Sequence, residues 1–206
     1  QLVRMALFQW LLPHQKNVNL LADLLHFYQA SGLQRLTGRS GLQKLLPPVP
    51  SRKERKPLPE KLATSFPIRD KVAFFTGCVM GALYPHVNRD TVEVLMAAGC
   101  DVVVPEDQCC CGALHLHSGE EAVALTLAKR NIDAFERAEA SKVIVNSAGC
   151  GALLKGYDSL LRDDPVYAPR AMAFSQSVMD ISEYLAVSGM NGRLNRLDMN
   201  VVYHEP

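Results

Sequence analysis

The sequence predicts an α/β protein with an open, mostly parallel sheet and flanking helices, preceded by a helical segment. Apolar runs at 72–75, 102–104, 143–145 and 201–203 are continuous rather than alternating, as in strands buried on both faces of a parallel sheet. Helical patterns alternate with these runs. This strand–helix order implies right-handed crossovers and a doubly wound sheet.

Composition excludes several functional classes. Hydrophobic residues make up 48% and charged residues 21% of the 206 positions, which is ordinary for a globular protein. The net charge of +1 gives no broad basic field for nucleic acid or an anionic membrane surface. No run reaches the roughly 18 apolar residues that span a bilayer.

The sequence divides into three segments that differ in composition and periodicity. Residues 1–45 are expected to form a helical connector, because leucines recur at helical spacing between positions 20 and 28. Residues 46–70 contain six prolines and a cluster of charges, which predicts an extended, solvated linker. Residues 71–206 carry the strand and helix patterns and all the cysteines, and form the expected main domain.

Three helices are predicted between the strands. The first ends at Gly99, a typical stop. The second begins with a capping box formed by Ser118 and Glu121. The third begins at one of two serines, at 175 or 177, passes through Met179 and stops near Gly189.

The candidate site consists of cysteines that follow predicted strands. Cys78, the pair Cys110 and Cys111, and Cys150 each come shortly after a different strand. Because the carboxyl ends of parallel strands share one edge of a sheet, where open α/β folds bind ligands, these four thiols should meet. Cys100 precedes its strand, so it is expected at the opposite edge as a small buried hydrophobe.

Such a density of thiols favours metal or redox chemistry. Thiolates repel one another unless a cation or cluster takes up their charge. Glycines let the backbone approach closely and point N–H groups at sulfur. Four of them flank the ligand positions: Gly77, Gly112, Gly149 and Gly151. Tetrahedral zinc, an iron–sulfur cluster and buried free thiols are all compatible with this pattern.

Three motifs resemble the cysteine-rich CCG domain of heterodisulfide reductases and of iron–sulfur subunits of glycolate and lactate oxidases. They are Phe-Thr-Gly-Cys at 75–78, Cys-Cys-Gly-Ala-Leu-His at 110–115 and Asn-Ser-Ala-Gly-Cys-Gly at 146–151. The residues at 28–34 and 160–165 are similar to the glycolate oxidase iron–sulfur subunit specifically. In that family a ferredoxin-like part precedes the domain and a second cysteine-rich repeat follows it. The chain is therefore expected to be a fragment that stops before the second repeat.

The resemblance implies a Rossmann-like domain and a function. Cys78, Cys110, Cys111 and Cys150 would hold an iron–sulfur cluster, [4Fe–4S], with zinc as the alternative. The chain would be a non-catalytic electron-transfer subunit that serves FAD-containing glycolate oxidase subunits. It would be cytoplasmic, with peripheral association at the inner face of the membrane through the complex. A structural zinc domain and a thiol–disulfide oxidoreductase are the competing interpretations.

Two departures from the family pattern bear on the site. Ser147 replaces the first cysteine of the Cys-x-x-Cys pair that ends the heterodisulfide reductase motif, which removes one ligand. Cys109 stands where the family often has glycine, and is either a spare thiol or an alternative ligand. His115 and His117 follow the triple-cysteine turn and are interpreted as loop residues, although hydrogen bonding to a cluster or ligation is the other interpretation.

Overall fold

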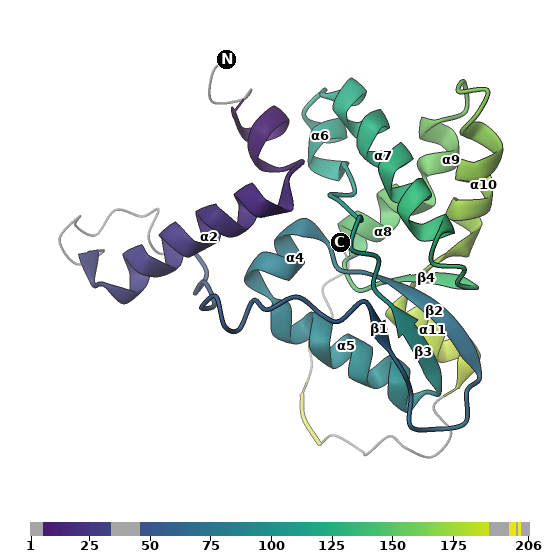
Figure 1. The fold of residues 1–206 in the computed structure, drawn as a ribbon, viewed down its shortest axis with the longest axis horizontal. Coiled ribbons are helices and arrows are strands. Elements are labelled where there is room, and N and C mark those ends of the chain that lie inside the picture. The colour runs from purple at the N-terminus through teal and green to yellow at the C-terminus, as the bar shows by residue number, and fades with distance from the viewer. Residues whose placement is uncertain (1–5, 34–45, 190–197, 201, 203–206) are drawn as a thin grey trace.

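The computed structural model describes residues 6–33, 46–189, 198–200 and 202. A five-stranded sheet lies at its centre (Figure 1). In spatial order its strands are β1 (Lys61–Leu62), β3 (Cys100–Val103), β2 (Asp70–Phe75), β4 (Lys142–Val145) and β5 (Val178–Asp180). β1 runs antiparallel to β3, and the other neighbours are parallel. The predicted open, mostly parallel sheet is confirmed.

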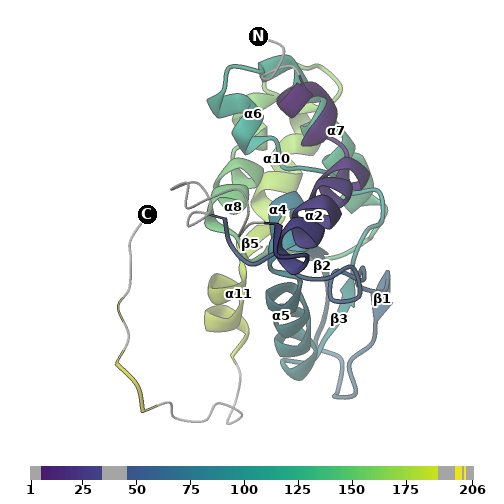
Figure 2. The same cartoon turned by 90° about the vertical axis from the view of Figure 1, so that its left-hand side faces the viewer.

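Helices cover both faces of the sheet (Figures 1 and 2). One layer contains α7 (Glu121–Glu136), α8 (Ala148–Lys155), α9 (Tyr157–Leu160) and α10 (Ala168–Ser177), and the other contains α5 (Pro85–Ala97) and α11 (Ile181–Ser188). The strands are apolar throughout because alternate side chains face the two layers. Ala73 and Phe75 pack with α7–α10, whereas Val72 and Phe74 pack with α5 and α11.

The order of the strands fixes where a site can form. The chain passes from β2 to β3 on one side, then crosses to β4 on the other side of β2. Open α/β sheets bind ligands at the carboxyl ends of strands around such a reversal. The turns that leave these ends lead into the short helices α4 (Cys78–Leu83) and α6 (Ala113–His117) and into α8.

The described part of the N-terminal segment, residues 6–33, is largely helical, as predicted, and the rest of the predicted connector 1–45 lies outside the described residues. The described part contains a π-helix at Ala6–Leu11 and helix α2 at Gln15–Ala30. α2 packs Val18 and Ala22 against α4 and Val49, and it projects away from the sheet (Figure 1). Large apolar side chains line another side of α2 and are exposed, including Leu24 at 61% and Phe27 at 64%. A helix that is apolar on two sides has more apolar surface than this domain covers.

Two predicted helix starts are wrong. α7 begins after Glu120, with no side-chain cap, and Ser118 instead ends α6, so the Ser118–Glu121 capping box does not form. The serines at 175 and 177 lie at the end of α10, and Met179 belongs to β5. The last helix starts with a capping box of Asp180 and Glu183 and ends at Gly189, the predicted stop.

Two further sequence features can be placed against the structure. β1 lies within the Pro-rich segment 46–70, and its pairing with β3 ties that segment to the sheet. Of the strand predicted at 201–203, Val201 and Tyr203 lie outside the described residues. No helix in the described part of the chain is long and apolar enough to cross a bilayer.

Candidate metal centre at the carboxyl edge of the sheet

Three turns bring the four predicted cysteines to one edge of the sheet. Cys78 is the first residue of α4 after β2, Cys110 and Cys111 lie between β3 and α6, and Cys150 lies in the first turn of α8 after β4. Cys100 is opposite Asp70 at the start of the paired strands, which is the other edge. The strand assignment therefore separates Cys100 from the other four.

The four thiols influence one another in a row. The interactions that shift their pKa values run from Cys78 to Cys110, from Cys110 to Cys111, and from Cys111 to Cys150. Hydrogen bonding to Cys110, then burial, raises the pKa of Cys78, and the bonds to Cys110 and Cys150, then burial, raise that of Cys111. Hydrogen bonds from Cys111, then from Cys78, lower the pKa of Cys110. Only part of this cluster ionises easily while no cation balances it.

These sulfurs suit a thiolate-bound metal centre. The three sulfurs of Cys78, Cys110 and Cys111 are buried, and the backbone N–H of Gly112 points at the Cys110 sulfur at 3.5 Å. Cysteine thiolates are the ligands of iron–sulfur clusters and of structural zinc. Among the described residues, however, no three His, Cys, Asp or Glu side chains already stand as a site for a single metal ion.

Two buried polar side chains hold the backbone of the triple-cysteine turn. Asn131 of α7 accepts from the Cys109 N–H at 2.9 Å and donates to the Cys110 carbonyl at 3.1 Å. The Tyr157 hydroxyl donates to the Cys111 carbonyl at 2.8 Å. A second Asn131 N–H donates to the Tyr157 hydroxyl at 3.1 Å, so the two side chains support one another. Every cysteine of the turn is thereby fixed through its own backbone.

A second set of polar side chains connects the turns that follow β2, β3 and β4. Gln108 accepts from the Thr76 N–H at 2.8 Å, which ties the turn after β3 to the turn after β2. Asn88 donates to the Thr76 carbonyl at 2.9 Å. Asn146, directly after β4, donates to the Asn88 side-chain oxygen at 2.9 Å. The relative position of the cysteine-bearing turns is therefore set by hydrogen bonds as well as by the sheet.

Sequence reasoning missed these supporting side chains. Asn131 and Tyr157 are fully buried, and burial of a polar group is not visible in a sequence without the fold. Asn131 does stand next to Ile132 on the apolar face of α7, and a polar residue on such a face is a signal that it has a buried partner.

Residues 72–155 match the model of the CCG family, described as a cysteine-rich domain. Residues 1–52 match the linker region of the glycolate oxidase iron-sulfur subunit. The chain contains a CCG cysteine-rich domain. The CCG match contains all four candidate ligands, and the linker match contains the π-helix and α2.

Several relatives of this chain are iron–sulfur proteins by name. The chain is 42% identical over 196 residues to the probable glycolate oxidase iron-sulfur subunit of Bacillus subtilis, covering 90% of this chain and 44% of that protein. The Escherichia coli glycolate oxidase iron-sulfur subunit is 32% identical over 145 residues (68% of this chain, 36% of that protein). A third relative, lactate utilization protein A of Exiguobacterium sp., is 35% identical over 114 residues (55% and 46%). The chain thus spans less than half the length of each. No solved structure matches it.

Cys109, the first cysteine of the triple-cysteine turn, has different contacts from Cys110 and Cys111. The Cys109 thiol lies 3.6 Å from the Leu127 carbonyl and 3.5 Å from the Asn131 side-chain oxygen, and it can donate to both. Burial raises its pKa to about 12. A thiol that is buried, protonated and hydrogen bonded to α7 is a poor nucleophile. Of the two roles predicted for Cys109, these contacts favour the spare thiol.

Two other side chains approach the sulfurs. The interaction with Cys111, and then that with Ser147 directly before α8, lowers the pKa of Cys150. His115 of α6 is fully buried and lies within interaction range of the Cys110 sulfur. Burial lowers the pKa of His115, but hydrogen bonding to Cys110 and its charge outweigh burial and raise it. His117 is exposed.

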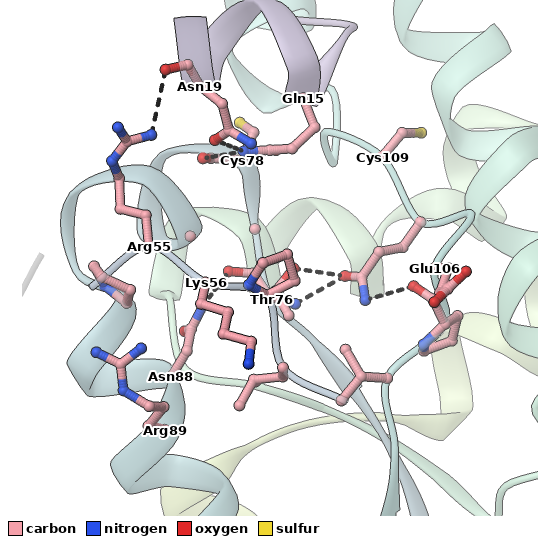
Figure 3. Close-up of a pocket in the computed structure, with 18 residues that line it drawn as sticks. Gln15, Asn19, Arg55, Lys56, Thr76, Cys78, Asn88, Arg89, Glu106 and Cys109 are labelled. Atoms are coloured by element: carbon pink, nitrogen blue, oxygen red, sulfur yellow. Dashed lines mark hydrogen bonds between the residues drawn. The ribbon is translucent and has the colours of Figure 1, made fainter. Parts of the chain in front are cut away.

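A cavity of about 320 Å³ borders the site on the Cys78 side (Figure 3). Arg55 lines it but is buried, and its guanidinium is already used in hydrogen bonds to α2 and to nearby backbone. Lys56 and Arg89 add positive charge to the lining, and Glu106 adds negative charge. The cavity leads toward Cys78 through a lining of net positive charge.

Proposed function

We propose that this CCG domain is an electron-transfer module in which Cys78, Cys110, Cys111 and Cys150 hold an iron–sulfur cluster of the [4Fe–4S] type. The observation that carries the proposal is the convergence of three separate turns, which brings these four cysteines to one sheet edge. The CCG match and the iron–sulfur names of the relatives favour a cluster over zinc.

The chain's own residues would bind and orient the cluster, which supplies one-electron transfer when bound. The thiols would have to lose protons to become ligands. The turns themselves would stay in place, since Asn131, Tyr157 and Gln108 hold the backbone rather than the sulfurs. The Gly112 N–H would remain aimed at the Cys110 sulfur.

The electron source in this proposal is an FAD-containing partner that oxidises glycolate or a similar 2-hydroxy acid. The names of the glycolate oxidase and lactate utilization relatives support this substrate class. The sequence has no dinucleotide-binding glycine motif that would hold a flavin in this chain. We propose α2 as part of the docking surface, because Leu20, Leu24 and Phe27 expose an apolar stripe there. By the same family resemblance, the complex would lie in the cytoplasm at the inner face of the membrane.

Metal analysis tests the ligand assignment. Cys78→Ser, Cys110→Ser, Cys111→Ser and Cys150→Ser should each lose most of the iron and sulfide bound after anaerobic reconstitution, with loss of the brown visible absorption. Cys100→Ala is the matched control and should keep both. Stoichiometric zinc in a colourless wild-type protein would replace the electron-transfer proposal with a structural one. Equal iron loss in Cys100→Ala would contradict the assignment of ligands to one edge.

Activity measurement tests the role in a complex. The chain alone should not reduce a dye with glycolate, and dye reduction should require the flavoprotein partner together with the full-length subunit. Turnover by the isolated chain would show an enzyme in its own right and would contradict the electron-carrier proposal.

A further inference from the structure

We propose that the cavity on the Cys78 side of the site binds a small organic anion, a molecule with an apolar body and one negative charge such as an aromatic carboxylate (Figure 3). The inference goes beyond the proposed function, because binding in this cavity requires no metal. A molecule bound there would lie beside Cys78 and therefore next to the proposed cluster.

The first argument is the size and lining of the cavity. Its volume of about 320 Å³ is at the lower end of the range for small-molecule sites, roughly 300–1,000 Å³. Apolar side chains reach it from three separate segments: Leu58 from the Pro-rich segment, Pro85 from the start of α5, and Val104 from the residue after β3. Sites for small molecules are mostly apolar, with a few polar groups that set orientation. The lining therefore suits a small apolar body.

The second argument is charge that has no partner. Lys56 lines the cavity, and its ammonium group has no hydrogen-bond or ion-pair partner among the residues that the structure describes (Figure 3). Arg89 donates from Nη1 to the Glu54 carbonyl at 2.7 Å, and its other guanidinium N–H groups have no partner in the described part of the chain. Glu106 adds one carboxylate to the lining. Two cations and one carboxylate are complementary to a ligand with a single negative charge.

Neighbouring charged groups do not change this balance. The Arg55 guanidinium is bound to the Asp23 carboxylate and to two backbone carbonyls, so it is already neutralised. The Glu54 carboxylate accepts from the backbone N–H and the hydroxyl of Ser51, at 2.7 and 2.6 Å, and so is used within its own turn. The two cations named above are therefore available to a ligand.

The third argument is that hydrogen bonds already hold the walls of the cavity in place. The side-chain oxygen of Gln108 accepts from the N–H and the hydroxyl of Thr76, at 2.8 and 3.1 Å. Its amide nitrogen donates to two backbone carbonyls, at 3.3 and 3.0 Å. A ligand that enters a site with ordered walls does not have to order them, which lowers the entropic cost of binding.

The test is isothermal titration calorimetry of the full, metal-free chain under anaerobic, reducing conditions. The probe is 2-naphthoate, and 2-naphthamide is its uncharged counterpart of nearly the same shape. We expect one 2-naphthoate per chain, bound about tenfold more tightly than the amide, because only the carboxylate pairs with Lys56 and Arg89. Since these cations are in contact with solvent, the difference should shrink as salt is added.

Two variants locate the bound probe. Lys56→Gln should weaken the binding of 2-naphthoate about fivefold, the effect of one partly exposed ion pair, whereas Lys53→Gln, in the same charged run but outside the lining, should not. Gly81→Leu should abolish binding, because Gly81 lines the cavity and a Cβ added there meets no atom within 4 Å. Gly149→Leu is the matched change in α8, where an added Cβ also meets nothing, and it should bind as the wild type does.

Several results would overturn the inference. They are absence of 2-naphthoate binding, equal affinity for the amide, and wild-type affinity in folded Gly81→Leu, which would place the probe elsewhere on the surface. Far-ultraviolet circular dichroism checks folding, and if Gly81→Leu is unfolded, unchanged affinity in Lys56→Gln overturns the inference instead. Iron content decides the proposed function separately. A chain that takes up no iron but binds 2-naphthoate in this cavity overturns the proposed function alone.

Discussion

The two edges of the central sheet use cysteine in opposite ways. At the carboxyl edge, five cysteines lie in the turns or helix starts that follow three strands, and buried amide and hydroxyl side chains fix the backbone of the triple-cysteine turn. At the amino edge, Cys100 begins β3, and its sulfur lies 3.1 Å from the Tyr184 hydroxyl. The residue type is the same, but one edge gathers thiols and the other isolates one. Whether a cysteine joins the candidate site therefore depends on the end of the strand at which it lies, more than on which strand carries it.

The largest effect is expected from Asn131→Leu at the carboxyl edge. The change keeps the volume but leaves the Cys109 N–H and the Cys110 carbonyl without their partner, which should lower the free energy of unfolding by about 3 kcal/mol. Iron retention should fall as well, because the turn is no longer held. Urea unfolding and metal analysis measure the two effects. Thr126→Val, on the exposed side of α7, should change neither, and iron binding at the wild-type level in Asn131→Leu would contradict the supporting role.

Matched glycines allow the edges to be compared directly. Gly112 and Gly99 both have φ of 92°, a conformation that costs an L-residue about 1–2 kcal/mol. A Cβ at Gly99 would also meet the Pro67 carbonyl oxygen at 2.9 Å, whereas at Gly112 the nearest atom, Ala124 Cα, is 3.4 Å away. Gly99→Ala should therefore destabilise the fold more, yet only Gly112→Ala should reduce bound iron. Unfolding and iron assays on both variants test this. If Gly99→Ala lost iron and Gly112→Ala kept it, the assignment of the metal centre to the carboxyl edge would be contradicted.

Removing the sulfur at the amino edge should have a smaller effect. Cys100→Ala removes the contact with the Tyr184 hydroxyl, which still has Asp70 within 3.3 Å. We expect a loss of about 1 kcal/mol in unfolding free energy, with iron content unchanged. Cys100→Ser, which can restore the hydrogen bond, is the control and should recover part of this loss.

The smallest effect concerns a partly exposed ion pair between α7 and the loop that precedes α10. Lys129, which lies 2.5 Å from Asp164, and then the Tyr167 backbone N–H lower the pKa of Asp164 from 3.8 to about 2. A carboxyl whose pKa is lower in the folded state stabilises the fold when ionised, so this contribution is present above about pH 4 and is lost as the pH falls toward 2. The free energy of unfolding of the metal-free Asp164→Asn variant should depend less on pH between about 4 and 2 than that of the metal-free wild type. Because the pair is partly exposed, the difference should be small and should shrink further in salt.

The sequence predicted the sheet and the edge at which each cysteine lies, because both depend on local patterns. Continuous apolar runs mark buried parallel strands, and a cysteine's position before or after a run decides its edge. The errors arose where local signals compete. Ser118 had the spacing of a capping box but ends α6, and Met179 fits a helical face but lies in the edge strand β5. A three-residue strand has too few positions to show a period.

The supporting residues of the site could not have been predicted for a different reason. The contacts of Asn131, Gln108 and His115 join segments from 21 to 107 residues apart, and such contacts exist only once the layers are packed. Sequence patterns give the face of a helix but not the partner across from it. The ligand assignment itself stays a prediction until metal is measured.

Placing the candidate ligands on three different strand ends has a consequence for the supply of iron in the cell. In small zinc domains the ligands are close in sequence, and the metal itself drives folding. Here the thiols meet only after β2 has paired with β3 and β4, and the two apolar layers that hold these strands consist largely of residues other than the ligands. Folding should therefore precede metal insertion. If the proposed cluster is the metal centre, a cell short of iron would accumulate the folded, metal-free protein, which could be filled when iron returns without new protein synthesis.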